Sequence, residues 1–161
     1  MPGHSEKDVK EEETLSLDTY ENVNIRHLAF YGRESRERIL HSNILVSGLQ
    51  GLGVEIAKNL IFAGVKSVTL HDERDVEMWD LSGSYVYLEA DIGNNRATVA
   101  AEKLQHQSHS VAVSALACEL TSDKLTEFHA VVWTNSSLEK AKEIDHYCHN
   151  HKPPILFIMS E

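Results

Sequence analysis

The sequence predicts an α/β domain of the doubly wound type, in which helices cover both faces of a mostly parallel sheet. Short apolar segments alternate with segments whose apolar residues recur at three- and four-residue spacing. A glycine-rich turn, Gly48 to Gly53, directly follows the first apolar segment, as in βαβ units. With 161 residues, the chain is long enough to bury the core of one such domain.

The first βαβ unit accounts for the residues around the glycine turn. A short helix expected from Glu34 to Leu40 leads to Asn43–Ser47, a short apolar run typical of a strand buried on both faces. Apolar side chains at helical spacing predict a helix from Val54 to Phe62, with Gly64 placed to end it. Ser67–His71 is β-branched and apolar, so it is expected to form the second strand.

The alternation continues to the C-terminus and predicts five parallel strands or more. Ser122 is the expected N-cap of a short helix, and two prolines separate the last helix from the last strand. Because the chain stops directly after that strand, we expect a truncated domain. The further helices are expected at Asn95–Gln105, Ser122–Thr126 and Leu138–His149, and the further strands at Ser110–Leu116, Ala130–Thr134 and Ile155–Met159.

Charge is concentrated at the N-terminus. Residues 1–22 hold seven acids against two lysines, whereas the whole chain has 15 basic and 25 acidic residues and a net charge of −10. This composition predicts a disordered acidic tail over residues 1–22 and a folded domain over residues 23–161. The acid excess is unfavourable for binding nucleic acid or an anionic membrane. Two cysteines and the lack of a leader or an 18-residue apolar run indicate a cytoplasmic and nuclear location.

The glycine turn is the first candidate binding site. A dinucleotide fingerprint has glycine at its first, third and sixth positions, but here Gln50 takes the third position between Gly48, Gly51 and Gly53. Asp72 ends the second strand, where an acid binds ribose hydroxyls. The residues alone leave two interpretations open: a nucleotide site, or a turn that only packs a helix on a strand.

The segment from Asp72 to Asn94 is unusually long for a link between a strand and a helix. Its acids and its aromatic residues Trp79, Tyr85 and Tyr87 predict a segment that covers a ligand or faces a partner.

Metal binding and thiol catalysis are not expected. His146 and His149 share a helix face, while Cys148 points away toward the core, so no metal site is predicted. Cys118 lies beside Glu119, with Asp123 following, and is expected to lack a nearby cation, which is unfavourable for a reactive thiolate. Neither cysteine is therefore expected to be a catalytic nucleophile.

Five stretches of the chain together follow the pattern of one known family: 46–60, 63–73, 79–82, 91–97 and 147–151. On these stretches, the chain from about Tyr20 onward resembles the N-terminal, non-catalytic adenylation half of eukaryotic ubiquitin-activating enzymes, most closely the plant form. This resemblance implies a Rossmann-like domain of the ThiF type.

The resemblance also implies how the site has changed. In the family's catalytic half, MgATP is bound by an acid ending the second strand, by an Asn, an Arg and a Lys beyond it, and by a metal-binding Asp after the fourth strand. Asp72 keeps the first position, but Asp80, Gly83 and Thr134 replace the Asn, the Arg and the metal ligand, and Arg96 stands near the Lys position. A cation without the magnesium ligand does not organise a triphosphate for attack. The chain is thus expected to be inactive alone and to hold no firmly bound cofactor, with MgATP in a partner half.

The resemblance assigns one residue a role in the partner's site. Arg26 matches an N-terminal arginine that reaches the triphosphate bound in the partner half, although His27 replaces the family's glutamine beside it. The alternative is that Arg26 is a surface residue that forms an ion pair.

Three functions remain open at this point. The first is a non-catalytic half that supports ATP-dependent, ligase-class activation of ubiquitin by pairing with an active adenylation half, which would make ubiquitin an indirect partner. The second is a nicotinamide-dependent oxidoreductase or other nucleotide-binding enzyme that uses Gly48–Gly53 and Asp72. The third is a stand-alone interaction module similar to the non-catalytic subunit of the SUMO-activating enzyme.

Overall fold

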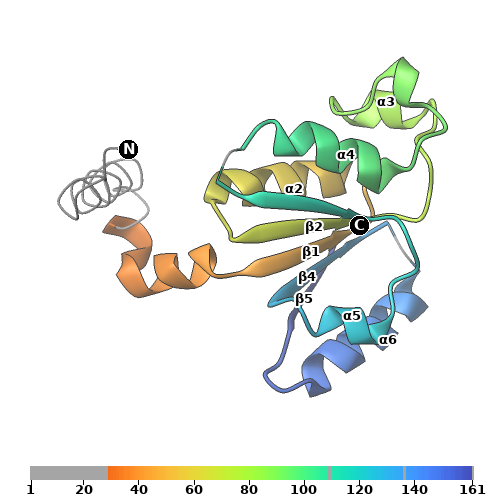
Figure 1. The fold of residues 1–161 in the computed structure, drawn as a ribbon. Coiled ribbons are helices and arrows are strands. Elements are labelled where there is room, and N and C mark those ends of the chain that lie inside the picture. The colour runs from red at the N-terminus through yellow and green to blue at the C-terminus, as the bar shows by residue number, and fades with distance from the viewer. Residues whose placement is uncertain (1–28, 109, 136, 161) are drawn as a thin grey trace, which may run out of the picture. The chain divides into compact units, whose positions relative to one another are not determined.

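A five-stranded, all-parallel sheet forms the centre of the domain in the computed structural model, which describes residues 29–108, 110–135 and 137–160 (Figure 1). Its strand order is β3-β2-β1-β4-β5, so the chain reverses its direction of travel across the sheet after β3. The predicted parallel sheet is confirmed. The strands are β1 (Asn43–Ser47), β2 (Ser67–His71), β3 (Ala112–Leu116), β4 (Ala130–Thr134) and β5 (Leu156–Ser160).

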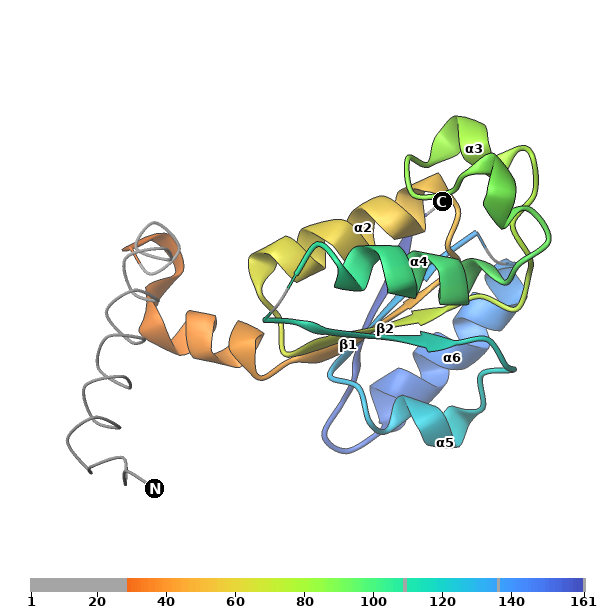
Figure 2. The ribbon, with the colours of Figure 1, turned by 45° about the horizontal axis from the view of Figure 1, so that its top comes forward.

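Helices cover both faces of this sheet, as the doubly wound prediction requires. In Figures 1 and 2, α2 (Gly51–Ala63) and α4 (Arg96–Gln105) lie on one face, and α5 (Ser122–Leu125) and α6 (Leu138–Asn150) lie on the other. Two short helical turns, α3 (Asp80–Gly83) and η1 (Glu89–Asp91), lie within the long link after β2. Within the described residues, no helix has the length and apolar character needed to cross a membrane.

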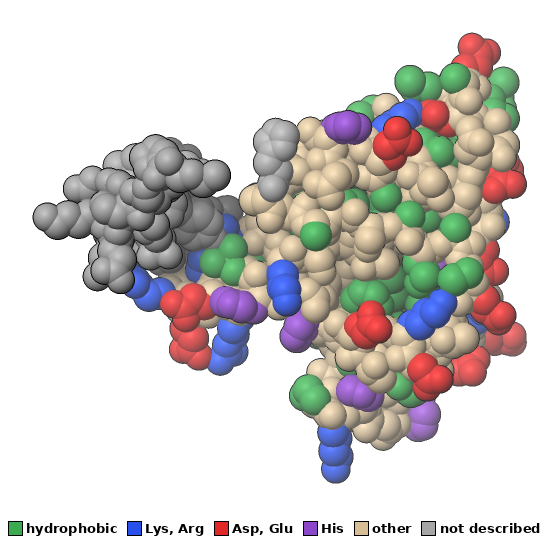
Figure 3. Space-filling view, in the orientation of Figure 1, with side chains coloured by type: hydrophobic (Ala, Val, Ile, Leu, Met, Phe, Trp, Pro, Cys, Tyr) green, Lys and Arg blue, Asp and Glu red, His purple; other side chains and the backbone are tan. Residues whose placement is uncertain are grey.

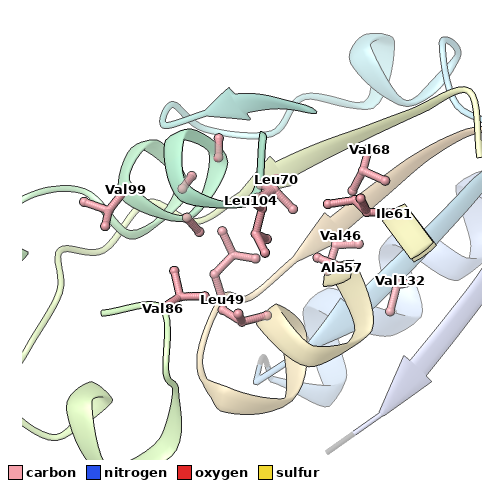
Figure 4. Packing of buried hydrophobic residues seen from close by; sticks show 14 of the residues in the cluster. Val46, Leu49, Ala57, Ile61, Val68, Leu70, Val86, Val99, Leu104 and Val132 are labelled. Carbon is pink, nitrogen blue, oxygen red and sulfur yellow. The ribbon is translucent and has the colours of Figure 1, made fainter. Parts of the chain in front are cut away.

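Two hydrophobic cores correspond to these two faces. Val46 and Leu70 point toward α2 and α4, as Figure 4 shows, and each has an exposed fraction of 0%. The neighbouring residue Leu45 and Trp133 of β4 point to the opposite face and pack with α6. Because successive residues of the central strands β1 and β4 are buried on opposite faces, these two strands read as continuous apolar runs in the sequence.

Several predicted boundaries were wrong by a few residues. α2 begins at Gly51 rather than at Val54, because the last residues of the glycine turn already adopt helical geometry. Thr121, not Ser122, is the N-cap residue of α5. β3 begins two residues later than expected, and β5 lies one residue further along the chain. Gly64 ends α2 in the left-handed conformation, as predicted.

The N-terminal part that the structure describes begins with a helix over residues 29–40. This helix includes the one predicted from Glu34. The chain divides into two compact units after Arg38, and the sheet with its covering helices belongs to the unit that starts at Ile39. The predicted tail over residues 1–22 and the candidate residue Arg26 lie outside the described residues.

Candidate functional site

The glycine turn is shaped by close contacts between backbone segments. Gly48 has a φ of +90°, and a Cβ atom added there would lie 2.1 Å from the carbonyl oxygen of Thr134. A Cβ atom added at Gly53 would lie 1.8 Å from the carbonyl oxygen of Gly48. Real Cβ atoms do not approach this closely, so backbone packing alone accounts for glycine at both positions.

The first residue of α2 is covered by the long link. A Cβ atom added at Gly51 would lie 2.3 Å from the carbonyl oxygen of Gly83, which ends α3. In related folds the N-terminus of this helix binds phosphate, because its N–H groups are unpaired and its dipole is positive. Here the carbonyl oxygen of Gly83 already lies against that helix end.

The carboxylate of Asp72 is bonded within the chain. Its Oδ2 atom accepts a hydrogen bond from the Leu49 N–H (2.9 Å), and its Oδ1 atom accepts one from the Arg74 N–H (3.0 Å). The side chain of Arg74 lies 3.6 Å from Oδ1, and Asp72 itself is only 4% exposed. Asp72 therefore links the glycine turn to the end of β2 by hydrogen bonds.

Arg96 lies in the interior, with an exposed fraction of 1%. Its Nε donates to Oδ2 of Asp80 over 2.8 Å, and its Nη1 lies 3.7 Å from Oδ2 of Asp72. The same oxygen of Asp80 also accepts from the Glu77 N–H (2.8 Å). We call Asp72, Asp80 and Arg96, with these bonds, the Arg96 network. The network joins the C-terminal end of β2 to the first residues of α3 and α4. It contains two buried carboxylates and one buried guanidinium.

Tyr87 ties the long link to the glycine turn at a second point. Its hydroxyl donates to the carbonyl oxygen of Leu49 over 2.7 Å, and the side chain is buried. Burial raises the pKa of Tyr87 well above its ordinary value, with the carboxylates of Asp72 and Asp80 adding to the effect. The hydroxyl therefore stays protonated and remains a donor.

Thr134 is the residue at the position of the expected metal ligand. Its hydroxyl donates to the carbonyl oxygen of Gly48 over 2.6 Å and lies 3.2 Å from that of Ser47. The side chain thus joins the end of β4 to the start of the glycine turn. Among the residues that the structure describes, no group of three His, Cys, Asp or Glu side chains is arranged to hold a metal ion.

A cavity of about 470 Å³ opens beside Asp72 at the carboxyl ends of β1, β2 and β4. We call it the strand-end cavity. His71 and Trp133 line it, and their rings are stacked with centroids 6.5 Å apart and an angle of 26° between the ring planes. Burial lowers the pKa of His71, although Glu73, the Cys118 backbone and Asp72 oppose this shift. Nδ1 of His71 lies 2.8 Å from Oγ of Ser47.

The structure brings most of the predicted site residues together. Gly48, Gly51, Gly53, Asp72 and Arg96 all belong to one connected region around the start of α2. The sequence analysis did not single out His71 and Trp133, the two ring residues that line the cavity. Their positions could have indicated them, because each is one of the last two residues of a strand whose carboxyl end borders the glycine turn.

The two cysteines differ in their surroundings. Cys148 is buried in the core under α6, as predicted. The expectation that Cys118 lacks a nearby cation was wrong, because the Lys124 ammonium lies 3.0 Å from its Sγ atom. Lys124 follows six residues later, and the turn into α5 brings it back to the exposed thiol.

The strand order, the glycine turn and the acid that ends β2 define a Rossmann-like α/β domain. A family model described as the ThiF family matches residues 22–160, and the chain belongs to that family.

Similarity to ubiquitin-activating enzymes is confirmed at the level of sequence. The chain is 56% identical over 141 residues to ubiquitin-activating enzyme E1 2 of Arabidopsis thaliana and 57% identical over 141 residues to its namesake from Triticum aestivum. It is 44% identical over 133 residues to ubiquitin-like modifier-activating enzyme 1 of Homo sapiens. These matches cover 88%, 88% and 83% of the chain, but only 13% of each relative's length.

Solved structures share the fold. The crystal structure of E. coli tRNA N6-threonylcarbamoyladenosine dehydratase, TcdA, matches with a TM-score of 0.71 and 22% sequence identity, over 88% of this chain and 61% of that one. The same enzyme in complex with ATP matches with the same TM-score, over 60% of its chain. This likeness establishes the arrangement of strands and helices.

Proposed function

We propose that this chain is the non-catalytic adenylation half of a ubiquitin-activating enzyme, and that it supports ATP-dependent activation of ubiquitin by pairing with an active half. The similarity to relatives that are named ubiquitin-activating enzymes supports ubiquitin activation as the reaction in this proposal. The observation that carries the non-catalytic role is the Arg96 network, in which the groups best placed to bind a nucleotide already bind one another.

Adenylation needs cations that are free to meet a triphosphate and an oxygen ligand for magnesium. The guanidinium of Arg96 is buried and bonded to Asp80, so its charge is compensated inside the chain. Gly83 offers no side chain to phosphate, and the hydroxyl of Thr134 is bonded to the backbone of Gly48. These arrangements favour a structural half over a catalytic one.

The active half would bind MgATP and the C-terminus of ubiquitin, so ubiquitin is an indirect partner of this chain. The chain itself would hold no firmly bound cofactor, and it would bind neither nucleic acid nor a membrane. The assembled enzyme would be a ligase of the cytoplasm and nucleus.

The deciding experiment mixes the purified 161-residue chain with an active adenylation half from a plant ubiquitin-activating enzyme. We expect the two to co-elute, and we expect the melting temperature of the chain to rise with added partner, because binding to the folded state stabilises it by mass action. Ubiquitin-dependent exchange of pyrophosphate into ATP should require the active half. Exchange by this chain alone, abolished by Asp72→Ala, would contradict the proposal.

Arg26 has a separate test in the assembled enzyme. If its guanidinium stabilises charge on the partner's triphosphate, Arg26→Ala should slow single-turnover adenylation without weakening co-elution. Arginine fingers are worth roughly 10³-fold or more where they dominate charge stabilisation, and a smaller loss is expected beside a half that keeps its own cations. Arg26→Lys should also be impaired, because an ammonium does not reproduce the planar guanidinium. Equal rates would leave Arg26 as a surface residue.

A further inference from the structure

The long link after β2 carries large apolar side chains on its surface. Trp79 has an exposed fraction of 79% and Met78 one of 64%. The full set, which we call the link patch, is Met78, Trp79, Tyr85, Leu88 and Ile92. In Figure 3, hydrophobic side chains lie at the top of the molecule, over α3 of Figure 1, with acidic side chains near them. Exposed surface rich in Trp, Tyr and Met is typical of sites that bind other proteins.

Packing within the domain does not account for the link patch. The link also has a buried side, formed by Val76, Val86 and Tyr87, which belong to the core under α2 and α4. The link therefore buries the apolar side chains that this core needs, and the patch residues are additional to them.

The link is held in place from several directions. The Lys103 ammonium donates to the carbonyl oxygen of Val86 over 2.8 Å, and the Val76 N–H donates to that of Asn94 over 2.8 Å. The Arg96 network holds the start of α3 in the same way. Because the surface is ordered before any partner arrives, binding loses less conformational entropy there.

The surroundings of the link patch are acidic. Arg74 is the only cation of residues 73–95, and its side chain lies 3.6 Å from Asp72. The Lys58 ammonium lies 5.1 Å from the centre of the Tyr85 ring, but it is paired with Glu55. The exposed acids of the link are Glu73, Asp75, Glu77 and Glu89.

This charge selects among the partners that an apolar patch could bind. A second copy of the chain would bring acids against acids, and like charges across an interface are unfavourable. An anionic membrane or a nucleic acid would be repelled for the same reason. A protein segment with apolar side chains beside lysine or arginine complements both the patch and its rim.

We infer that the link patch is a docking surface for a basic, amphipathic segment of another protein. The apolar side chains of that segment cover Trp79 and Met78, and its cations lie beside the exposed acids of the link. This inference goes beyond the proposed function, which assigns no contact to the link patch.

The test uses two synthetic amphipathic peptides with leucine at the same positions, one with lysine and one with glutamate at the others. Each is titrated into the full chain, whose two tryptophans each give one indole N–H signal in a nitrogen–proton correlation spectrum. Trp79→Phe assigns the two signals. We expect the lysine peptide to shift the Trp79 signal saturably and to leave that of the buried Trp133 in place. The glutamate peptide should bind roughly tenfold more weakly or less.

The apolar part of the inference is tested by the double variant Met78→Ser, Trp79→Ser, with calorimetry as the measurement. Binding of the lysine peptide should weaken roughly tenfold or more, because the central contacts are lost. Both side chains are exposed, so the melting temperature should not fall. Phe62→Ser is the matched control: Phe62 is 62% exposed but lies about 16 Å along α2 from the first residue of that helix, and the affinity should not change.

The charge part is tested by the double variant Glu77→Gln, Glu89→Gln. It should weaken binding of the lysine peptide several-fold, whereas Glu139→Gln on α6, which covers the opposite face of the sheet, should not.

Four outcomes would overturn the inference: no shift of the Trp79 signal, equal binding of the two peptides, undiminished binding by the serine variant, or a dimer of the chain in ultracentrifugation that the serine variant abolishes. The last outcome would make a second copy the occupant of the patch. None of these measurements involves an active adenylation half, so failure here and failure of the proposed function are distinguishable.

Discussion

The Arg96 network and the strand-end cavity share Asp72, yet they differ in the exposure of their carboxylates. In the network, each carboxylate accepts hydrogen bonds from the chain itself, and the buried guanidinium is paired with Asp80. In the cavity, the lining acids Glu73, Glu119 and Glu143 are exposed to solvent. The difference teaches that carboxylates at one end of the sheet can be buried and bonded within the chain while neighbouring ones stay in water.

The largest expected effect tests whether the network holds the domain together. Arg96→Met should lower the free energy of unfolding by about 3–5 kcal/mol, because it leaves the buried carboxylate of Asp80 without its cation. Urea denaturation measures this change. Arg38→Ala removes an exposed ion pair with Glu34 and should cost less than about 1 kcal/mol. Similar losses in the two variants would contradict the structural importance of the network.

The next effect tests the backbone packing beneath the network. Gly53→Ala should lower the free energy of unfolding by about 3 kcal/mol, because the added methyl group meets the carbonyl oxygen of Gly48 and forces backbone to shift. Gly83→Ala is the matched control, since a Cβ atom there has nothing closer than 4.0 Å. Equal stability of the two variants in chemical denaturation would show that the turn relaxes freely.

A smaller effect tests the attachment of the long link. Tyr87→Phe removes the hydrogen bond to the Leu49 carbonyl oxygen and should lower the free energy of unfolding by about 1 kcal/mol. Tyr85→Phe, which removes an exposed 3.3 Å contact with Gln107, should change it by less than about 0.5 kcal/mol. Thermal unfolding of both variants distinguishes them, and a neutral Tyr87→Phe would mean that this hydrogen bond does not help to hold the link.

The smallest expected effect is the contribution of His71, at the cavity, to the pH dependence of the domain's stability. Because burial lowers the folded-state pKa of His71, the unfolded chain binds a proton more readily than the folded chain. His71 should therefore make the domain less stable as pH falls below the ordinary histidine pKa of about 6.5. His71→Gln should lose less stability between pH 7 and pH 5 than the natural chain does. A steeper loss in the variant would show that the neighbouring acids, Glu73 and Asp72, outweigh burial.

Much of the fold could be predicted because its signals are local. The strands are short apolar runs and the helices have apolar residues at helical spacing, so both signals are visible in the sequence. The glycines and Asp72 also indicated the right end of the sheet. α3 could not be predicted, because this four-residue helix is held by the pairing of Asp80 with Arg96, sixteen residues away. The contact of Lys124 with Cys118 was missed for a similar reason, since a turn creates it.

The pairing of Arg96 with Asp80 also limits how such a domain can change through single mutations. Replacing Asp80 alone leaves a buried guanidinium without its bonded partner, and replacing Arg96 alone leaves a buried carboxylate in the same state. Each first step toward a different ligand set is therefore costly, although the double replacement need not be. Residues of this kind are expected to change together in lineages, so their present combination tends to persist whether or not it still serves a ligand.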